Sequence, residues 1–531
     1  MARRVRGGSH LARAARPTAR HRHRPPGATG IDRRRRPRHR DGEGQASDGR
    51  RAQGAKGDRV VARSGPGAGT PAVVIAAPAS GTGKTTVTTG LIGALRAAGR
   101  TVAPFKVGPD YIDPGYHALA AGRPGRNLDP NLVGPDLVPE LFAHGSRGAD
   151  IAVVEGVMGL FDGRITPGQP SGGTGSTAHV AKLLGAPVIL VVDVAGHSQS
   201  LAALLHGFAA FDTGIRLAGV ILNRVGSPRH EEVVRAAAES VGLSVVGVLR
   251  RDDALAVPSR HLGLIPAAER SPQARAAVDA MAALVADSVD LAAVEAIAQD
   301  AGESPGPAWS AADAVGEPVP GSPVVAVAAG RAFTFGYPEH AELLTAAGAR
   351  VVEFDPLTDP LPAQTAALVL GGGFPEEHAD ELSANRPLRE AVRSHVAAGR
   401  PVHAECAGYL YLTSGVARNG RPGPELAGAL PASGSFADRL TLGYRDGVAV
   451  TDSVLYRAGE RVTGHEFHRA TVPSSATPAW GWRADGTCVD GHVHAGVHAS
   501  FLHVHPAAVP AAIKRFVAAA ARATPRERVY R

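Results

Sequence analysis

The segment APASGTGKTT has the residue types and spacing of a loop that binds nucleotide phosphates. Gly81 and Gly83 would let backbone N–H groups come close to phosphate oxygens. Lys84 would reach the β- and γ-phosphates, and the hydroxyl group of Thr85 would ligate Mg²⁺. Pro78 stands where such loops usually begin with glycine. The loop follows an apolar run and precedes a helical pattern, so we expect a site for ATP.

Four acidic residues follow two other apolar runs. Asp110 and Asp113 lie in KVGPDYIDPGYH, and Glu155 and Asp162 lie in VVEGVMGLFDG. Ligands of an open α/β sheet bind beyond the carboxyl ends of its strands, so the four side chains should converge on the nucleotide. Mg²⁺ is usually held by one or two carboxylates together with phosphates and water. The pattern therefore predicts a magnesium-assisted phosphate chemistry.

A second group of reactive residues lies in the C-terminal half. Cys406, in HAECAGYLYL, falls between an apolar run and a helix-like run, the setting that exposes a nucleophile and lowers a thiol pKa. The glycines of LVLGGGFPE would offer backbone N–H groups to an oxyanion. His503 and His505, in HASFLHVHP, are both candidate bases. Cys488 has no such setting, and we interpret it as structural.

Apolar runs of strand length alternate with helical patterns in both halves of the chain. This alternation predicts parallel sheets that are covered by helices on both faces. In the first half the expected strands are 71–79, 101–107, 150–157, 186–194 and 216–225. In the second half they are 323–330, 349–356, 366–373 and 400–408, before a strand- and loop-rich part from about 440 to 506.

We therefore expect an α/β protein with two doubly wound domains. The phosphate-loop domain is predicted over 71–296 and the thiol-containing domain over 323–520. Residues 297–322 are rich in Gly, Pro and Ser and are predicted to be a linker. Residues 521–531 are predicted to be a tail.

The basic charge of the chain is concentrated in residues 1–70, which hold 19 Lys and Arg against 5 Asp and Glu. With few apolar residues, this segment is predicted to be disordered. It fits either an electrostatic arm for nucleic acid or a dispensable extension. We favour the extension, and expect no nucleic-acid partner, because no aromatic residues alternate with the charges.

The composition excludes several classes of protein. Hydrophobic residues are 44% of the 531 residues, and no apolar stretch reaches the roughly 20 residues that a membrane-spanning helix needs. Two cysteines are too few for a disulfide framework and indicate a reducing compartment. The Arg-rich N-terminus has no apolar core behind it, as a secretory signal would. We exclude secreted, membrane and collagen-like proteins and expect a cytoplasmic one.

In their order along the chain these motifs resemble the cobyrinic/hydrogenobyrinic acid a,c-diamide synthase family. The resemblance covers about residues 72–520. The matching motifs are SGTGKTTVTTGL, FKVGPDYIDPGYH, VVEGVMGLFDG, GVILNRVGSPRH, RHLGLIPAAE, GGGFPE, HAECAGYLYL, GYR, GHEFH and ASFLHVH.

The resemblance implies a ligase domain similar to dethiobiotin synthetase and a class I glutamine amidotransferase domain. It implies an enzyme of cobalamin biosynthesis that amidates the a and c acetate carboxylates of a corrin, hydrogenobyrinate or cobyrinate, with ATP, Mg²⁺ and ammonia from glutamine. An acyl phosphate and a cysteine thioester would be its intermediates. A homodimer is compatible with this, and the oligomeric state stays open.

Site residues are carried over from the family position by position. In the amidotransferase domain the resemblance implies Cys406 as nucleophile, His503 as base, and Gly372, Gly373 and Ala407 as oxyanion donors. Because His505 stands where many amidotransferases have the acid of a triad, we expect a dyad. In the ligase domain it implies a nucleotide site of Gly81, Gly83, Lys84, Thr85, Thr86 and Asn223, a metal site of Thr85, Asp113 and Glu155, and a substrate or ATP face of Asp110, Tyr111 and Asp162.

Three alternatives remain. The first is another tetrapyrrole amidotransferase, either a cobyric acid synthase or a nickel-sirohydrochlorin a,c-diamide synthase; the presence of GHEFH disfavours the former. The second is a nucleotide-dependent regulator, which the intact Cys406 and His503 disfavour. The third, nucleic-acid binding by residues 1–70, is compatible with the enzyme. The sequence determines neither the order of amidation nor whether the corrin already holds cobalt.

Overall fold

The computed structural model describes residues 69–166, 169–251, 271–302, 306–484 and 486–523, which all belong to the compact unit Ser64–Arg531. The extension predicted over 1–70 and the tail predicted over 521–531 fall almost entirely outside the described residues, as does the RHLGLIPAAE motif. Among the described helices, none has the length and apolar character to cross a bilayer.

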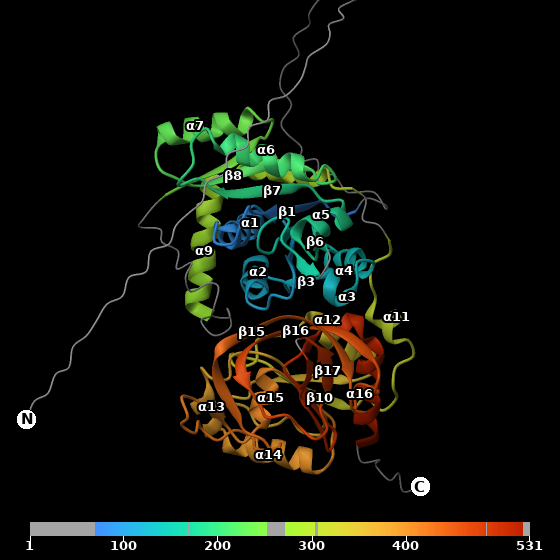
Figure 1. The fold of residues 1–531 in the computed structure, drawn as a ribbon. Coiled ribbons are helices and arrows are strands. Elements are labelled where there is room, and N and C mark those ends of the chain that lie inside the picture. The colour runs from blue at the N-terminus through green and yellow to red at the C-terminus, as the bar shows by residue number, and fades with distance from the viewer. Residues whose placement is uncertain (1–68, 167–168, 252–270, 303–305, 485, 524–531) are drawn as a thin grey trace, which may run out of the picture. The chain divides into compact units, whose positions relative to one another are not determined.

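The N-terminal half is built on seven parallel strands in the order β3-β2-β4-β1-β7-β8-β9 (Figure 1). These strands are β1 (Ala72–Ala76), β2 (Val102–Val107), β3 (Arg126–Leu128), β4 (Ile151–Glu155), β7 (Val188–Asp193), β8 (Leu217–Val225) and β9 (Val245–Arg250). The helices are α1 (Lys84–Ala97), α2 (Asp113–Ala121), α3 (Pro130–Val133), α4 (Leu137–Gly145), α5 (Thr177–Leu184), α6 (Leu201–Phe211), α7 (Pro228–Glu239), α9 (Ser271–Ser288) and α10 (Leu291–Gln299). A two-stranded ribbon of β5 (Arg164–Thr166) and β6 (Gln169–Thr174) lies outside the sheet.

The central strand β1 shows why the sequence forms this sheet. All five of its residues are buried, as expected for a parallel strand that is covered on both faces. Val73 and Ile75 pack with α1, α2, α9 and α10, whereas Val74 and Ala76 belong to a core with α4, α5, α6 and α7. The neighbours of β1 are β4 and β7, so the strand order reverses beside it. The carboxyl end of β1, which carries the phosphate loop, therefore lies at the ligand-binding edge of the sheet.

The C-terminal half contains two sheets. The first has the order β11-β10-β12-β13-β20-β19 and is parallel except for β19; the second, β18-β17-β15-β16-β21, is antiparallel along that path, with β14 pairing with β15. The strands are β10 (Val324–Ala328), β11 (Arg350–Phe354), β12 (Thr365–Leu370), β13 (Val402–Glu405), β14 (Val416–Ala417), β15 (Gly434–Ala449), β16 (Arg461–Thr471), β17 (Trp480–Arg483), β18 (Thr487–Asp490), β19 (His492–His494), β20 (Val497–Ser500) and β21 (His503–Val504). The helices are α11 (Ala311–Val315), α12 (Pro338–Ala346), α13 (Ala379–Ala384), α14 (Arg386–Ala397), α15 (Ala407–Leu412), α16 (Pro510–Ala523) and the 3₁₀ helix η2 (Pro506–Ala508).

Helices cover both faces of the first C-terminal sheet. Its residues pack with α12 and α16 on one side and with α14 and α15 on the other. The second sheet brings β21, which starts at His503, beside β16. The predicted fold class, α/β with two doubly wound domains, is confirmed. The segment predicted to be a linker contains α11, and the predicted domain boundaries stay predictions.

Candidate functional site

The phosphate loop is held by the strand on its far side. Gly83 has φ +93°, and a Cβ atom there would lie 2.3 Å from Nδ2 of Asn223, so only glycine fits. Asn223 Nδ2 donates a hydrogen bond to the carbonyl oxygen of Thr82 at 2.8 Å. The side chain of Lys84 folds over the loop and donates to the carbonyl oxygen of Met158 at 2.8 Å. Asn223 thus lies against the loop, as expected, and its contact with adenine stays a prediction.

Two of the predicted acids meet the loop in a buried charge cluster. The Thr85 hydroxyl group donates to Glu155 Oε1 at 2.6 Å and to Asp113 Oδ2 at 3.4 Å. Lys106 Nζ lies 2.9 Å from Asp113 Oδ2 and 3.0 Å from Glu155 Oε1. The imidazole of His117 contacts the other oxygen of Glu155 at 2.7 Å. Lys106 and His117 have no role in the sequence analysis, and the structure places both at the centre of this cluster.

The charges of the cluster balance one another. Burial alone would lower the pKa of Lys106, but Asp113 and Glu155 reverse this and raise it, so the ammonium group stays charged. Burial alone would raise the pKa of Glu155, but Lys106 and His117 hold it well below its usual range. Burial and, secondarily, Lys106 lower the pKa of Lys84 to about 8. The cluster is therefore ionised at neutral pH.

The other two predicted acids shape loops. Asp110 Oδ1 accepts hydrogen bonds from the N–H groups of Ile112 and Asp113, and Asp162 Oδ2 accepts one from the N–H group of Gly159. The hydrogen bonds to Asp110 also hold in place the loop that carries Asp113, whose carboxylate belongs to the cluster. Thr86 is half-buried in the first turn of α1.

The oxygen set of Thr85, Asp113 and Glu155 fits a hard divalent cation such as Mg²⁺. The described residues contain no group of three or more His, Cys, Asp or Glu side chains that would hold a metal ion. Around a Mg²⁺ ion bound by these two carboxylates, the remaining coordination positions would thus be filled by phosphate and water oxygens, as is usual for Mg²⁺.

Cys406 occupies a strained turn between β13 and α15. Its φ of 48° and ψ of −100° lie outside the regions that non-glycine residues prefer, a strain that is typical of nucleophile elbows. The backbone after this turn packs closely on β12: a Cβ atom on Gly408 would lie only 2.1 Å from the carbonyl oxygen of Leu370. Ala407 fits as a fully buried first residue of α15.

His503 lies beside Cys406 and has a carboxylate partner. Its Nδ1 is 3.2 Å from Glu405 Oε2, and the other oxygen of Glu405 lies 3.3 Å from His403 Nε2. Burial alone would lower the pKa of His503, but its interactions with Cys406 and Glu405 raise it to about 10. The imidazole is thus held protonated beside the thiol. The structure adds the carboxylate of Glu405 to the expected Cys406–His503 dyad, and we interpret the three groups as a triad.

The predicted oxyanion donors differ in whether their N–H groups already donate to a backbone carbonyl oxygen. The N–H group of Gly372 already donates to the carbonyl oxygen of Phe335 at 3.2 Å, so this part of the prediction is not supported. In the described residues the N–H groups of Gly373 and Ala407 have no backbone acceptor of this kind. His505 is the second candidate base; burial lowers its pKa to about 4, and its ring packs on Tyr337. His503, and not His505, is therefore placed to act as the base.

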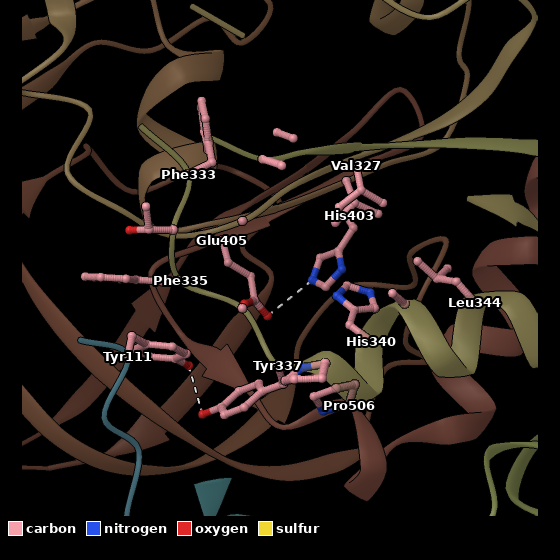
Figure 2. Close-up of a pocket in the computed structure, with 18 of the residues that line it drawn as sticks. Tyr111, Val327, Phe333, Phe335, Tyr337, His340, Leu344, His403, Glu405 and Pro506 are labelled. Carbon is pink, nitrogen blue, oxygen red and sulfur yellow. Dashed lines mark hydrogen bonds and ion pairs between the residues drawn. The ribbon is translucent and has the colours of Figure 1, made fainter. Parts of the chain in front are cut away.

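Tyr111 links the two halves of the chain. The sequence analysis assigned it to the substrate or ATP face, but its ring contacts Phe335 and His503, with centroids 5.0 Å away in each case. Its hydroxyl group donates to the hydroxyl oxygen of Tyr337 at 2.9 Å, as Figure 2 shows. The side chain of Tyr111 thus lies against the thiol site of the other half.

A cavity of about 350 Å³ is lined by residues from both halves (Figure 2). Its walls include Tyr111 and Pro114, which flank the loop of Asp113, and Glu405, which precedes Cys406. His340 faces His403 in this cavity, and burial lowers the pKa of His340 to about 4, so its ring is neutral. The cavity borders residues next to both reactive groups.

Two family models match the two halves. A CobQ/CobB/MinD/ParA nucleotide binding domain matches residues 73–265, and a CobB/CobQ-like glutamine amidotransferase domain matches residues 324–510. A hydrogenobyrinate a,c-diamide synthase of Mycobacterium tuberculosis is 60% identical over 86% of this chain and 99% of its own. The chain belongs to this a,c-diamide synthase family. It is therefore a glutamine-dependent amidating ligase with a nucleotide-binding domain.

Other members of the family show how widely the likeness extends. A hydrogenobyrinate a,c-diamide synthase of Streptomyces coelicolor is 54% identical over 85% of this chain and 98% of its own. A cobyrinate a,c-diamide synthase of Gloeobacter violaceus is 45% identical over 84% of this chain and 96% of its own. The roles of individual residues in this a,c-diamide synthase stay proposals.

Sequence reasoning missed Lys106, His117 and Glu405, and two of them, Lys106 and Glu405, left a signal. Each is a charged residue at the end of an apolar strand, in TVAPFKV and RPVHAE. Charged side chains are almost never fully buried unless they are paired, so each of them implied a partner from elsewhere in the chain.

Proposed function

We propose that this enzyme amidates the a and c acetate carboxylates of hydrogenobyrinate in cobalamin biosynthesis, using ATP and glutamine in the cytoplasm. The names of the relatives at 60% and 54% identity support this substrate. One observation carries the reaction type: a Cys406–His503–Glu405 triad and a phosphate loop with a buried carboxylate cluster occur in one compact unit. The first can release ammonia from glutamine, and the second can activate a carboxylate with ATP.

In the glutaminase half, Cys406, whose thiol proton is held by His503, attacks the carboxamide carbon of glutamine and forms a thioester. His503, oriented by Glu405, gives its proton to the departing ammonia and then takes one from the water that hydrolyses the thioester. The N–H groups of Gly373 and Ala407 are the donors available for the oxyanion.

In the synthetase half, the N–H groups of the loop at Gly81 and Gly83 bind phosphate oxygens, and Lys84 moves from the Met158 carbonyl to the γ-phosphate. Thr85, Asp113 and Glu155 would hold Mg²⁺, which would neutralise phosphate charge there. The corrin carboxylate attacks the γ-phosphorus and gives an acyl phosphate and ADP. Lys106 remains charged beside Asp113 and Glu155 and offsets the negative charge of these two carboxylates.

The cavity between the two reactive groups supports a protected path for ammonia. In bulk water at neutral pH ammonia is protonated and cannot act as a nucleophile. The apolar part of its lining and the neutral ring of His340 disfavour the ammonium ion, whereas the Glu405 carboxylate on the same wall attracts it. Neutral ammonia would then reach the acyl phosphate and displace phosphate to form the amide.

A direct assay tests this function. The purified enzyme is incubated with glutamine and Mg-ATP and with either hydrogenobyrinate or cobyrinate, and the products are read by mass. We expect the diamide of hydrogenobyrinate, formed with two glutamates and two ADP per corrin. Because the relative from Gloeobacter violaceus is named for cobyrinate, that substrate is the second candidate. A failure to amidate either corrin would refute the proposal.

A further inference from the structure

We propose that Tyr111 is a positioning residue of the glutaminase site: the loop that carries Asp113 holds the catalytic base His503 in place through the ring of Tyr111. This inference rests on the proposed function. It assigns to Tyr111 a role in glutamine hydrolysis, in the domain opposite to its own.

The contacts of Tyr111 place its ring on the imidazole of His503. Its ring centroid is 5.0 Å from that of His503, at an interplanar angle of 45°. On its other neighbour, Phe335, it stacks at 15°. Its side chain is nearly fully buried, and burial together with Tyr337, Glu405 and Cys406 raises its pKa well above the usual range. The hydroxyl group therefore stays protonated and bonded to Tyr337.

His503 needs a second contact to be fixed. The Glu405 carboxylate holds only the Nδ1 edge of the ring. In the described residues Nε2 has no resolved hydrogen bond other than its approach to Cys406. The backbone of Gly372 lies close to Cε1 of the ring, and an aromatic face that packs at a 45° tilt limits its motion on another side. Tyr111 supplies that face.

Tyr111 is in turn fixed to the synthetase cluster. Asp110 Oδ1 accepts hydrogen bonds from the N–H groups of Ile112 and Asp113, and Asn127 Nδ2 donates to the carbonyl oxygens of Gly108 and Asp110 at 2.8 and 2.7 Å. Asp113, two residues after Tyr111, contacts Thr85 and Lys106. A ligand that changes these contacts shifts a short, internally bonded loop, and Tyr111 carries the shift to His503. Loading of the synthetase site would in this way set the rate of glutamine hydrolysis.

The experiment compares Tyr111→Leu and Tyr111→Phe with the parent in three assays: glutaminase activity with and without Mg-ATP and corrin, its pH profile, and amidation from ammonium salts. For Tyr111→Leu we expect glutaminase kcat to fall at least tenfold, since a displacement of about 1 Å can cost on the order of 10²-fold. KM for glutamine and the ammonia-dependent rate should stay within about threefold, and the stimulation by Mg-ATP and corrin should disappear. Tyr111→Phe keeps the ring and should restore kcat to within about threefold.

The matched control is Tyr444→Phe. It also removes a 2.9 Å hydroxyl bond between the two halves, to Asp129, but its ring does not contact His503. We expect parent-like coupling from it.

Parent-like glutaminase kcat, pH profile and stimulation in Tyr111→Leu would overturn the inference. A Tyr111→Leu variant that lost ammonia-dependent amidation but kept its glutaminase activity would also overturn the inference, and would assign Tyr111 to the corrin face. Failure of the proposed function would give a different result: the parent would amidate neither corrin, whereas substitution of Tyr111 would still change the glutaminase activity.

Discussion

The two reactive centres of this enzyme are assembled in opposite ways. In the glutaminase centre, nucleophile and carboxylate are neighbours in the chain, Glu405 and Cys406, and only His503 comes from a distant strand. In the synthetase centre, Thr85, Lys106, Asp113 and Glu155 come from three separate segments, and every one of them contacts at least one other.

This difference shows where each centre derives its order. The glutaminase centre depends on a strained backbone turn and one histidine that is held protonated. The synthetase centre depends on the mutual neutralisation of two carboxylates and two ammonium groups that are largely buried. Removing one glutaminase group should therefore stop one chemical step, whereas removing one synthetase charge should disturb its partners as well.

The largest effect is expected from the nucleophile. Cys406→Ala should lower glutamine-dependent amidation by at least about 10³-fold, because the thioester cannot form. Amidation from ammonium salts should continue at near the parent rate, as measured by corrin mass. Cys488→Ala, at the only other cysteine, is the control and should be parent-like. If Cys406→Ala still consumed glutamine, or failed with ammonia, the division into two centres would be wrong.

Glu155→Gln tests the synthetase centre. The amide keeps the shape but removes the charge that balances Lys106, so ATP-dependent amidation from ammonia should fall by about 10²-fold. Added Mg²⁺ should recover part of the loss, and glutaminase activity should persist at least in part. Glu295→Gln, which breaks an exposed ion pair with Arg100, is the control. A parent rate in Glu155→Gln would mean that the cluster is structural.

Glu405→Gln tests whether the triad acts as one. Loss of the carboxylate charge should lower glutaminase kcat by about 10²-fold, the low end of what a positioned acid–base group contributes, since His503 keeps a hydrogen-bonding partner. Glu425→Gln, at a mostly exposed carboxylate, is the control. The variant should leave amidation from ammonium salts unchanged. A parent-like kcat would return the site to the dyad expected from the sequence.

The pH dependence of glutaminase sharpens this test. His503 has a folded pKa of about 10, above its unfolded value of about 6.5, so its contribution to stability is complete below about pH 6.5 and is lost as pH rises through about 10. The parent should keep glutaminase activity up to a basic limb near pH 10. In Glu405→Gln that limb should move to lower pH, as rates from pH 6 to 11 would reveal. An unmoved limb would show that Glu405 does not support the imidazolium.

The smallest effect is expected outside both centres. Removal of residues 1–70 should leave amidation within about a factor of two, because every motif of the family lies after Pro71. A loss of tenfold or more, which corresponds to about 1.4 kcal/mol of transition-state stabilisation, would give this segment a role in catalysis or folding.

Local patterns in the sequence were enough to determine the fold class, the phosphate loop and the nucleophile elbow. Each of these is encoded by neighbouring residues: an apolar strand, a glycine-rich turn and the start of a helix, as at Gly83–Lys84 and at Cys406. Acidic residues after apolar strands gave Asp113 and Glu155, and the family resemblance then selected His503 as the base. Sequence reasoning did not find Lys106 or Glu405, because their roles depend on partners that are distant in the chain, Glu155 and His503.

What the sequence determined by itself is therefore the set of elements and the chemistry that each can carry. Only the tertiary structure decided which side chains meet: that Lys106 neutralises Asp113 and Glu155, that Glu405 completes the triad, and that Tyr111 lies on His503. The physical reason is that strand and turn preferences act over a few residues, whereas ion pairs and ring contacts depend on which strands lie side by side. The order of the strands is set by the burial of the sheet as a whole, and no short sequence pattern encodes it.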